Sequence, residues 1–190
     1  MGEHGPSEGP LTAEELQLAA RNHGMPLEAL RYDITPTGLH YLLVHFDIPE
    51  IDESTWRLEV GGDVRHARSF TLAELRARAS ASAPVTMECA GNGRARLQPR
   101  PVSQPWLVEA VGTARWTGTP LRDVLAEAGV GPDTVEIVFS GADHGTQGTV
   151  EHDYERSLPL DVAMRPEVVV RITSSTSPAH LTPQEGYESP

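Results

Sequence analysis

The sequence is poor in three features, and each shortage argues against a class of protein. Cys89 is the only cysteine among 190 residues, so no internal disulfide can form and the thiol is free, ligated or intermolecular. Lys and Arg number 15 against 27 Asp and Glu, a formal net charge of −12, which argues against binding nucleic acid or an anionic membrane through overall charge. No apolar run approaches the roughly 18 to 20 residues of a membrane span.

Length and the N-terminal composition narrow the expectation further. A chain of 190 residues can bury one substantial core, and one domain is the default. Residues 1–6 are acidic and rich in Gly and Pro, without the basic and apolar regions of a signal peptide. We therefore expect a cytoplasmic protein with one domain over 26–170, an N-terminal extension over 1–25 that contains a short helix, and a disordered tail over 171–190.

Cys89 lies in a glycine-rich segment, with Arg94 and Arg96 close behind it. A thiolate rather than a thiol binds metals, and nearby positive charge lowers the pKa of such a group, so we interpret Cys89 as a metal ligand. The alternative is a small buried hydrophobic residue, the commoner state of a free cysteine. The run Arg94, Arg96 and Arg100 is a candidate anion site or a solvated loop.

Hydrophobic periodicity and turn residues predict the secondary structure. Strands are expected over 39–49, 56–62, 84–88, 134–141 and 168–172, and helices over 12–22, from Thr71, from Pro120 to Gly129, and around Val162 and Met164. In the strand over 134–141, Val135, Ile137 and Phe139 are expected on one face. Segment 116–119 has turn chemistry, and segment 141–145 is expected to be an acidic loop.

Five blocks of sequence, taken together in their order and spacing, resemble the molybdopterin-binding domain of the sulfite oxidase family. The blocks are 41–49, 87–92, 114–121, 139–143 and 156–160. The Cys-Ala-Gly-Asn block that begins at Cys89 and the Arg-Trp-Thr-Gly-x-Pro-Leu block over 115–121 are specific in combination. The resemblance implies an α+β fold with a mixed β-sheet core and short peripheral helices, like the sulfite oxidase catalytic domain.

The same resemblance implies a molybdenum–molybdopterin cofactor. Cys89 would supply the single protein thiolate to molybdenum, beside the pterin dithiolene and oxo or hydroxo groups, and thiolates suit such a soft, redox-active metal. Tyr41, His45 and Asp143 would contact the pterin, and His45 matches a histidine of the family's motif. The sequence has no haem-attachment motif or iron–sulfur cysteine set, so we expect a separate electron-transfer partner and a small-molecule substrate.

Two departures from the family bear on the substrate and on completeness. Sulfite oxidases carry an Arg-Asn pair immediately before the motif histidine, where this chain has Leu43 and Val44. Aliphatic side chains cannot replace the charge-assisted contacts of an arginine to an oxyanion, which counts against sulfite as the substrate. Near the C-terminus, Glu185 and Pro190 fall where the family has a cofactor-contacting histidine and an arginine, so we expect a domain that is truncated or divergent on that side.

The leading hypothesis is a molybdopterin-dependent oxidoreductase that transfers an oxygen atom to or from a small substrate. A sulfoxide reductase-like activity is an alternative within that class. Outside it, the chain would be a non-catalytic or inactive cofactor-binding fragment, or an interaction domain in which Cys89 is merely buried. Cofactor binding without turnover would distinguish the fragment from an enzyme, and thiol accessibility in the apo protein tests the last alternative.

Overall fold

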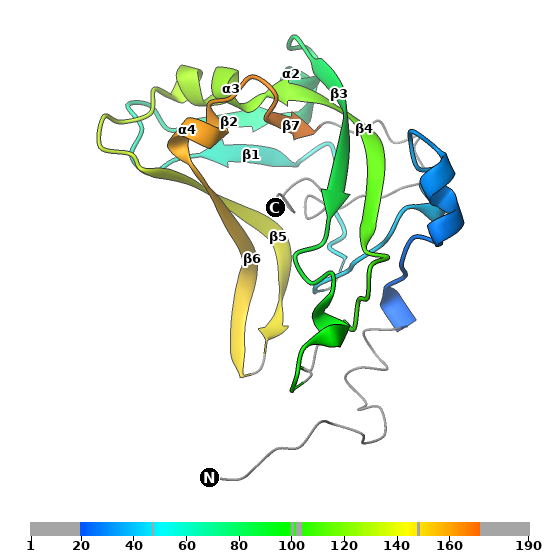
Figure 1. The fold of residues 1–190 in the computed structure, drawn as a ribbon. Helices are drawn as coiled ribbons and strands as arrows, with labels where there is room; N and C mark the ends of the chain where they lie inside the picture. The colour runs from blue at the N-terminus through cyan, green and yellow to red at the C-terminus, as the bar shows by residue number, and fades with distance from the viewer. Residues whose placement is uncertain (1–19, 47, 100, 102–103, 148, 172–190) are drawn as a thin grey trace. The chain divides into compact units, whose positions relative to one another are not determined.

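A computed structural model describes residues 20–46, 48–99, 101, 104–147 and 149–171 (Figure 1). The helix predicted over 12–22 lies mostly outside these residues, and the tail predicted over 171–190 lies almost entirely outside them. Within the described part of the chain, no helix is both long and apolar enough to cross a membrane.

Short strands and shorter helices make up the described chain. The helices are η1 (Leu27–Arg31), η2 (Thr37–Leu39), α2 (Leu72–Arg76), η3 (Arg94–Arg96), α3 (Leu121–Ala128) and α4 (Leu160–Ala163), where η marks a 3-10 helix. The strands are β1 (Arg57–Val60), β2 (Arg68–Thr71), β3 (Ala81–Glu88), β4 (Val111–Pro120), β5 (Glu136–Gln147), β6 (Val150–Pro159) and β7 (Val169–Arg171). They form three small sheets, with strand orders β1-β2, β3-β4-β7 and β5-β6. Sheets accompanied by short helices confirm the predicted α+β fold class.

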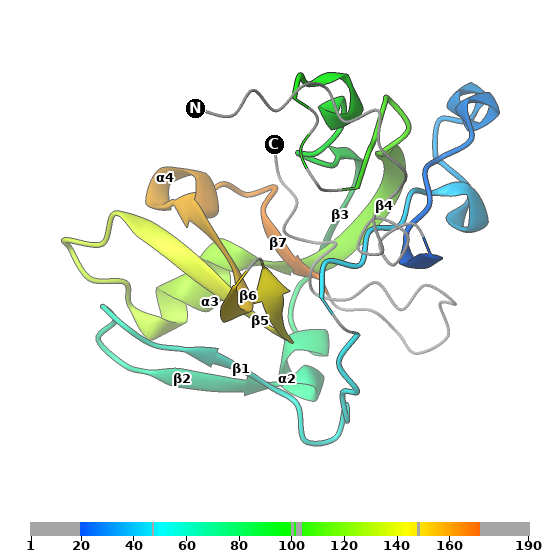
Figure 2. The same cartoon turned by 90° about the horizontal axis from the view of Figure 1, so that it is seen from below.

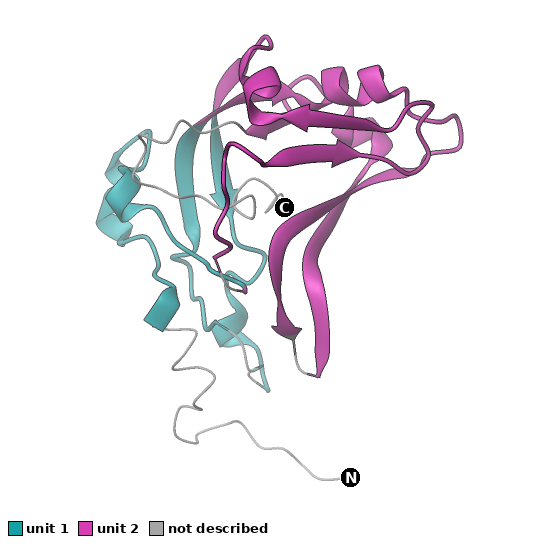
Figure 3. Cartoon of the chain, turned by 180° about the vertical axis from the view of Figure 1, so that it is seen from behind, with its two compact units in different colours: residues 1–45, 84–115, 188–190 teal, residues 46–83, 116–187 magenta. Residues whose placement is uncertain are grey.

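The chain divides into two compact units (Figure 3). Among the described residues, unit 1 comprises 20–45, 84–99, 101 and 104–115, and unit 2 comprises 46, 48–83, 116–147 and 149–171. The chain therefore leaves and re-enters each unit, and both β3 and β4 begin in one unit and end in the other.

Unit 2 has an apolar core built on β1, β2 and the helices α2 and α3. Strand β1 alternates exposed and half-buried residues and pairs antiparallel with β2, with Leu58 opposite Phe70, which confirms the strand predicted over 56–62. Buried Phe70, Leu75 and Val124 pack together, and Trp56 and Leu58 pack against them. Burial of such side chains supplies the main driving force for folding.

Both core helices begin or end at signals that the sequence carries. Thr71 accepts a hydrogen bond from the backbone N–H of Glu74, whose side chain accepts one from the Thr71 N–H, and this capping box starts α2 as predicted. The predicted helix α3 ends at Gly129, which has a φ of 72° in the left-handed region. Its buried residues lie at the spacing of one helix face: Leu121, Val124, Leu125 and Ala128.

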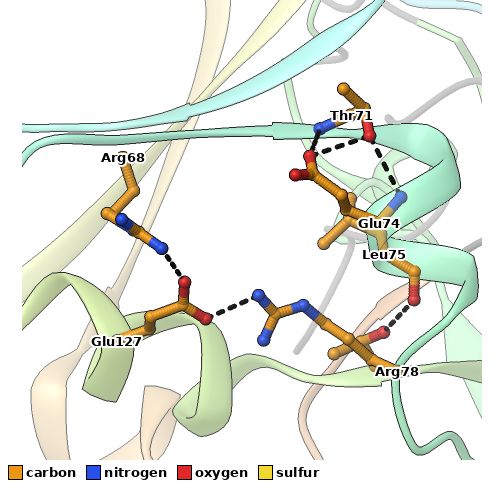
Figure 4. A network of polar contacts seen from close by, with 7 residues as sticks. Arg68, Thr71, Glu74, Leu75, Arg78 and Glu127 are labelled. Atoms are coloured by element: carbon orange, nitrogen blue, oxygen red, sulfur yellow. Dashed lines mark hydrogen bonds and ion pairs between the residues drawn. The ribbon is translucent and has the colours of Figure 1, made fainter.

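A polar network joins β2, the end of α2 and α3 at the surface of unit 2 (Figure 4). The Glu127 carboxylate accepts hydrogen bonds from the guanidinium groups of Arg68 and Arg78, the latter at 2.5 Å. The same two guanidinium groups lie 5.7 and 4.8 Å from the centre of the Phe70 ring. One carboxylate thus holds two cations beside a core aromatic ring, a favourable arrangement for both charges.

Segment 116–119, predicted as a turn, is instead part of strand β4. Gly118 lies opposite Arg171 of β7, in the antiparallel pair that also sets Thr119 opposite Val170. A Cβ on Gly118 would lie 2.2 Å from the carbonyl oxygen of Val170. The glycine therefore permits close approach of two strands rather than a reverse turn, and β7 confirms the strand predicted over 168–172.

Strands β5 and β6 form a long antiparallel hairpin (Figure 1 and Figure 2). The strand predicted over 134–141 is confirmed, but it continues through 141–145 with a register shift between Ser140 and His144. The predicted acidic loop is therefore wrong, because these residues form a bulge inside a strand. Ile137 and Phe139 pack on the core as predicted, whereas Val135 is 79% exposed and precedes the strand.

The strand predicted over 39–49 is wrong. Among its described residues, Leu42 pairs with His23 in an isolated bridge, and the N–H of Val44 donates to Oδ1 of Asn22 at 2.6 Å. Tyr41, Val44 and Phe46 are buried. The aromatic and branched residues that suggested a strand thus pack as core residues of an irregular segment, whose backbone is bonded by a side chain distant in sequence.

Candidate functional site

Strand β3, confirmed over the predicted residues 84–88, ends one residue before Cys89. The N–H of Cys89 donates to the carbonyl of Ala110 at 2.9 Å, and its carbonyl accepts the N–H of Asn92 at 2.8 Å, which closes a tight turn. The Cys89 side chain is 6% exposed, and the N–H of Gly91 points at its Sγ from 3.4 Å. A backbone donor directed at sulfur suits an anionic thiolate, a strong acceptor, better than a neutral thiol.

Three side chains meet at Gly91. A Cβ on this glycine would lie 3.5 Å from Sγ of Cys89, and 3.4 Å from both Cδ1 of Trp106 and Cδ of Arg94. Trp106 is 3% exposed, and its buried indole N–H has no hydrogen-bond partner among the described residues. Because a buried donor is normally satisfied, the loop has both a soft sulfur ligand and a spare donor, which fits a polar cofactor or substrate held there.

The structure describes two of the three arginines in the cationic run that follows Cys89. Arg94 and Arg96 belong to the 3-10 helix η3 and are exposed, and Arg100 lies outside the described residues. Gly93, which precedes η3, has a φ of 85°, a left-handed conformation that favours glycine. Arg94 contributes a positive charge beside the Cys89 loop, since its Cδ adjoins Gly91.

Tyr41 and His45 lie in unit 1 together with Cys89. Tyr41 is 6% exposed and stacks on His40, with ring centres 5.0 Å apart. Nδ1 of His40 is 2.9 Å from the Tyr41 carbonyl oxygen, and its ring lies directly over Gly112. His45 is half-buried at the end of the irregular segment. The roles of Tyr41 and His45 in cofactor binding stay predictions.

Asp143 lies in unit 2, in the bulge of β5. It is 1% exposed, and a Cβ on Gly141 would lie 2.7 Å from its Oδ1. A buried carboxylate is expensive to keep charged unless polar groups or cations surround it. The pterin contact inferred for Asp143 also stays a prediction.

The sequence assigns no functional role to Asn92, which lies in the Cys89 turn, or to Trp106, which adjoins Gly91. Asn92 belongs to the Cys-Ala-Gly-Asn block, and none of the five sequence blocks includes Trp106. Their importance comes from contacts with residues distant in the chain, such as Ala110 for Asn92. Among the described residues, no three or more His, Cys, Asp or Glu side chains gather as a metal site.

Comparison with known proteins decides the family. The profile of the family described as "Oxidoreductase molybdopterin binding domain" matches residues 45–188. The chain belongs to this family. The match includes Cys89, the bulge of β5 that carries Asp143, and His45 at its first residue.

Curated members of known activity are related to this chain over part of their length. Sulfite oxidase of Gallus gallus is 36% identical over 140 residues, which is 70% of this chain and 30% of that protein. Human mitochondrial sulfite oxidase is 33% identical over 159 residues, 81% of this chain and 29% of that protein. A nitrate reductase of Brassica napus is 31% identical over 184 residues, 94% of this chain and 19% of that protein. The chain thus spans less than a third of each of these relatives.

A solved structure shows the same fold. The sulfane dehydrogenase SoxCD of Paracoccus pantotrophus aligns with a TM-score of 0.62 at 22% sequence identity, over 86% of this chain and 44% of that chain. The likeness confirms the fold expected from the sulfite oxidase resemblance.

Proposed function

We propose that the chain is a molybdenum-cofactor-dependent oxidoreductase that moves an oxygen atom between water and a small substrate. The carrying observation is the Cys89 loop, in which a buried sulfur accepts the Gly91 N–H. The Trp106 indole, whose N–H has no hydrogen-bond partner among the described residues, lies against the same glycine. Membership of a molybdopterin-binding family supports molybdenum as the metal proposed for that sulfur. When bound, the cofactor supplies a two-electron redox centre and the oxygen-transfer chemistry.

The residues of the chain hold and shape this site. Cys89 provides one thiolate to the metal, and burial keeps bulk water away from the sulfur. Tyr41, His45 and Asp143 contact the pterin. The Trp106 N–H donates to a polar group of the cofactor or substrate, because its buried position leaves it no solvent partner.

The substrate end is expected to bind a polar oxygen without the arginine that sulfite oxidases place before the motif histidine. Here that position is Leu43, half-buried, followed by buried Val44. The Arg94 side chain passes beside Gly91, and one guanidinium suits a neutral or singly charged substrate better than a doubly charged oxyanion. A sulfoxide is therefore a candidate substrate beside sulfite and nitrate. The last two are the compounds that appear in the names of the relatives, sulfite oxidase and nitrate reductase.

Electrons reach or leave the site through a separate protein partner, and the proposed location is the cytoplasm. The proposal of a partner is supported by these 190 residues, which contain no haem-attachment motif and no iron–sulfur cysteine set. Pull-down from the native host's soluble fraction, followed by reduction of the bound partner in the presence of substrate, tests them together.

The test of the main proposal uses protein purified from a host that makes the molybdenum cofactor. We expect molybdenum and pterin in the wild-type protein, and turnover of sulfite, a sulfoxide or nitrate with a dye as electron carrier. The Cys89→Ala variant should lose turnover. Absence of molybdenum from the wild-type chain contradicts the proposal. Bound cofactor without turnover on any of the three substrates favours the alternative, a non-catalytic cofactor-binding fragment.

A further inference from the structure

The side chain of Asn92 bonds to both flanks of the Cys89 turn. Its Nδ2 donates to Oε1 of Glu88 at 2.8 Å, and its Oδ1 accepts the N–H of Ala110 at 3.3 Å. Its own backbone N–H donates to the Cys89 carbonyl. Asn92 therefore bonds to the residue before the cysteine, to the cysteine itself, and to the residue opposite it.

These contacts fix two chain segments that are distant in sequence. Glu88 is the last residue of β3, and Ala110 immediately precedes β4. Ala110 is fully buried, and both of its backbone polar groups are used: its carbonyl accepts from Cys89 and its N–H donates to Asn92. Without the Asn92 oxygen, that buried N–H would lose an acceptor, which disfavours the closed arrangement.

We propose that Asn92 is a positioning residue that holds the Cys89 sulfur in its buried orientation by pairing with the Glu88 carboxylate and the Ala110 N–H. The tight turn alone sets the backbone path between Cys89 and Asn92. The side-chain bonds tie that turn to β3 and to the start of β4, so the direction of the sulfur is set by the sheet rather than by a flexible loop. The benefit to catalysis rests on the proposed function, whereas the positioning itself does not.

The Asn92–Glu88 pair allows a swap of donor and acceptor. In Asn92→Asp, the new carboxylate still accepts the Ala110 N–H but faces Glu88 without a donor, so two like charges lie at hydrogen-bond distance. In the double variant Asn92→Asp/Glu88→Gln, the Gln amide can donate to the Asp and restores one bond with reversed direction. Glu88→Gln alone keeps an acceptor oxygen for Asn92 and serves as the matched control.

The test measures the rate at which a thiol reagent modifies the Cys89 thiolate in the apo form of this 190-residue chain, below the temperature at which it unfolds. The rate is read from the high-pH plateau of a pH–rate profile, because a carboxylate added beside a thiol raises its pKa and would slow the reaction at lower pH. We expect Asn92→Asp to react about tenfold faster than wild type, the size of one lost charge-assisted hydrogen bond. The swapped double variant should return to within about threefold of wild type, and Glu88→Gln should stay there as well. A wild-type rate for Asn92→Asp, or a double variant as fast as Asn92→Asp, would overturn the proposal.

Glu88→Ala provides a second route if Asn92→Asp does not fold. Glu88 is exposed, so its truncation removes the acceptor without opening a cavity. A several-fold faster modification of Cys89 is expected, and an unchanged rate counts against the role of the pair. The molybdenum content of wild type purified from a cofactor-producing host separates the proposed function from the positioning role. If that protein contains no molybdenum but the double variant restores the wild-type thiol rate, the proposed function is rejected and the positioning role of Asn92 stands.

Discussion

Gly118 and Val170 approach so closely that a Cβ on the glycine would lie 2.2 Å from the carbonyl oxygen of Val170. This contact lies in the only described pairing of β4 with β7, a ladder of three residue pairs. Such a short ladder cannot absorb the displacement of one strand without losing its hydrogen bonds. The side chain of residue 118 thus decides whether β7 pairs with β4.

Gly118→Ala is therefore expected to destabilise the protein by about 1 to 3 kcal/mol, the usual cost of forcing an extra group into a packed site. The measurement is urea unfolding followed by far-UV circular dichroism. Gly61→Ala is the matched control, because in the described part of the chain no atom beyond the neighbouring residues lies within 4 Å of a Cβ at that position. Equal midpoints for the two variants would show that β7 is free to move away from β4.

Glu127 is expected to contribute stability mainly through its two arginine partners. Hydrogen bonds from Arg78 and then from Arg68 lower the pKa of the Glu127 carboxyl below its usual value of 4.5. Stability from this group is therefore present above pH about 4.5 and is lost as the pH falls through the lowered pKa.

Glu127→Gln should lower the urea midpoint at neutral pH, and the difference from wild type should shrink in acid and in high salt, which screens surface charges. Glu167→Gln is the control, since Glu167 is exposed and none of the ion pairs described includes it. A difference that is the same at neutral and acidic pH would contradict this account of the network.

His144 is expected to make the β5–β6 hairpin sensitive to pH. Its Nδ1 is 2.7 Å from Oδ1 of Asp153, and its Nε2 is 3.2 Å from Oε1 of Glu151. Hydrogen bonds to Asp153 first and to Glu151 second raise the pKa of His144 above its usual value of 6.5. The charged imidazolium thus stabilises the folded hairpin below pH about 6.5, and this contribution is lost as the pH rises through the raised pKa.

His144→Gln should remove that dependence, so the wild type should exceed the variant in stability at pH about 6 and approach it at pH about 9. Urea unfolding at both pH values provides the measurement, and His66→Gln, an exposed histidine of the same unit, is the control. If the stabilities of wild type and His144→Gln fall in parallel as the pH rises, groups other than His144 cause the pH dependence.

The indole N–H of Trp106 gives a prediction about the cofactor. Trp106→Phe removes a buried donor that has no partner among the described residues. Removing this donor is favourable and partly offsets the cost of the lost packing volume, so the stability of the apo protein should change by about 1 kcal/mol or less. Cofactor retention during dialysis should nevertheless fall. Trp56→Phe, which alters a tryptophan packed on the core of unit 2, should not affect retention. Unchanged retention in Trp106→Phe would assign the residue to packing alone.

Elements with local signals could be predicted from the sequence. The capping box of Thr71 with Glu74 and the terminal Gly129 each act within one helical turn, so α2 and α3 were found. The strand expected over 39–49 failed because the backbone of Val44 bonds to Asn22, a non-local side chain. The composition of segment 116–119 favours a turn, and the sequence does not reveal that Gly118 lies against Val170, which is far along the chain.

Some residues of the candidate site are also recognisable from local sequence, and others depend on contacts between distant parts of the chain. Cys89 was recognisable because it is the only cysteine and sits in a specific motif. The roles of Asn92 and Trp106 depend on contacts with Ala110 and Gly91, which the sequence alone could not reveal. Segment 141–145 has turn-forming composition, yet pairing with β6 carries the strand through it with a bulge.

The central claim is that Cys89 is the protein ligand of a molybdenum cofactor. The most direct measurement is molybdenum K-edge X-ray absorption on wild type and Cys89→Ser, both purified from a host that makes the cofactor. The metal content of each protein is determined in parallel. We predict molybdenum in the wild type and one fewer sulfur neighbour in the variant, since a serine oxygen or water would replace the thiolate. A wild type without molybdenum, or identical sulfur coordination in the two proteins, would contradict the claim.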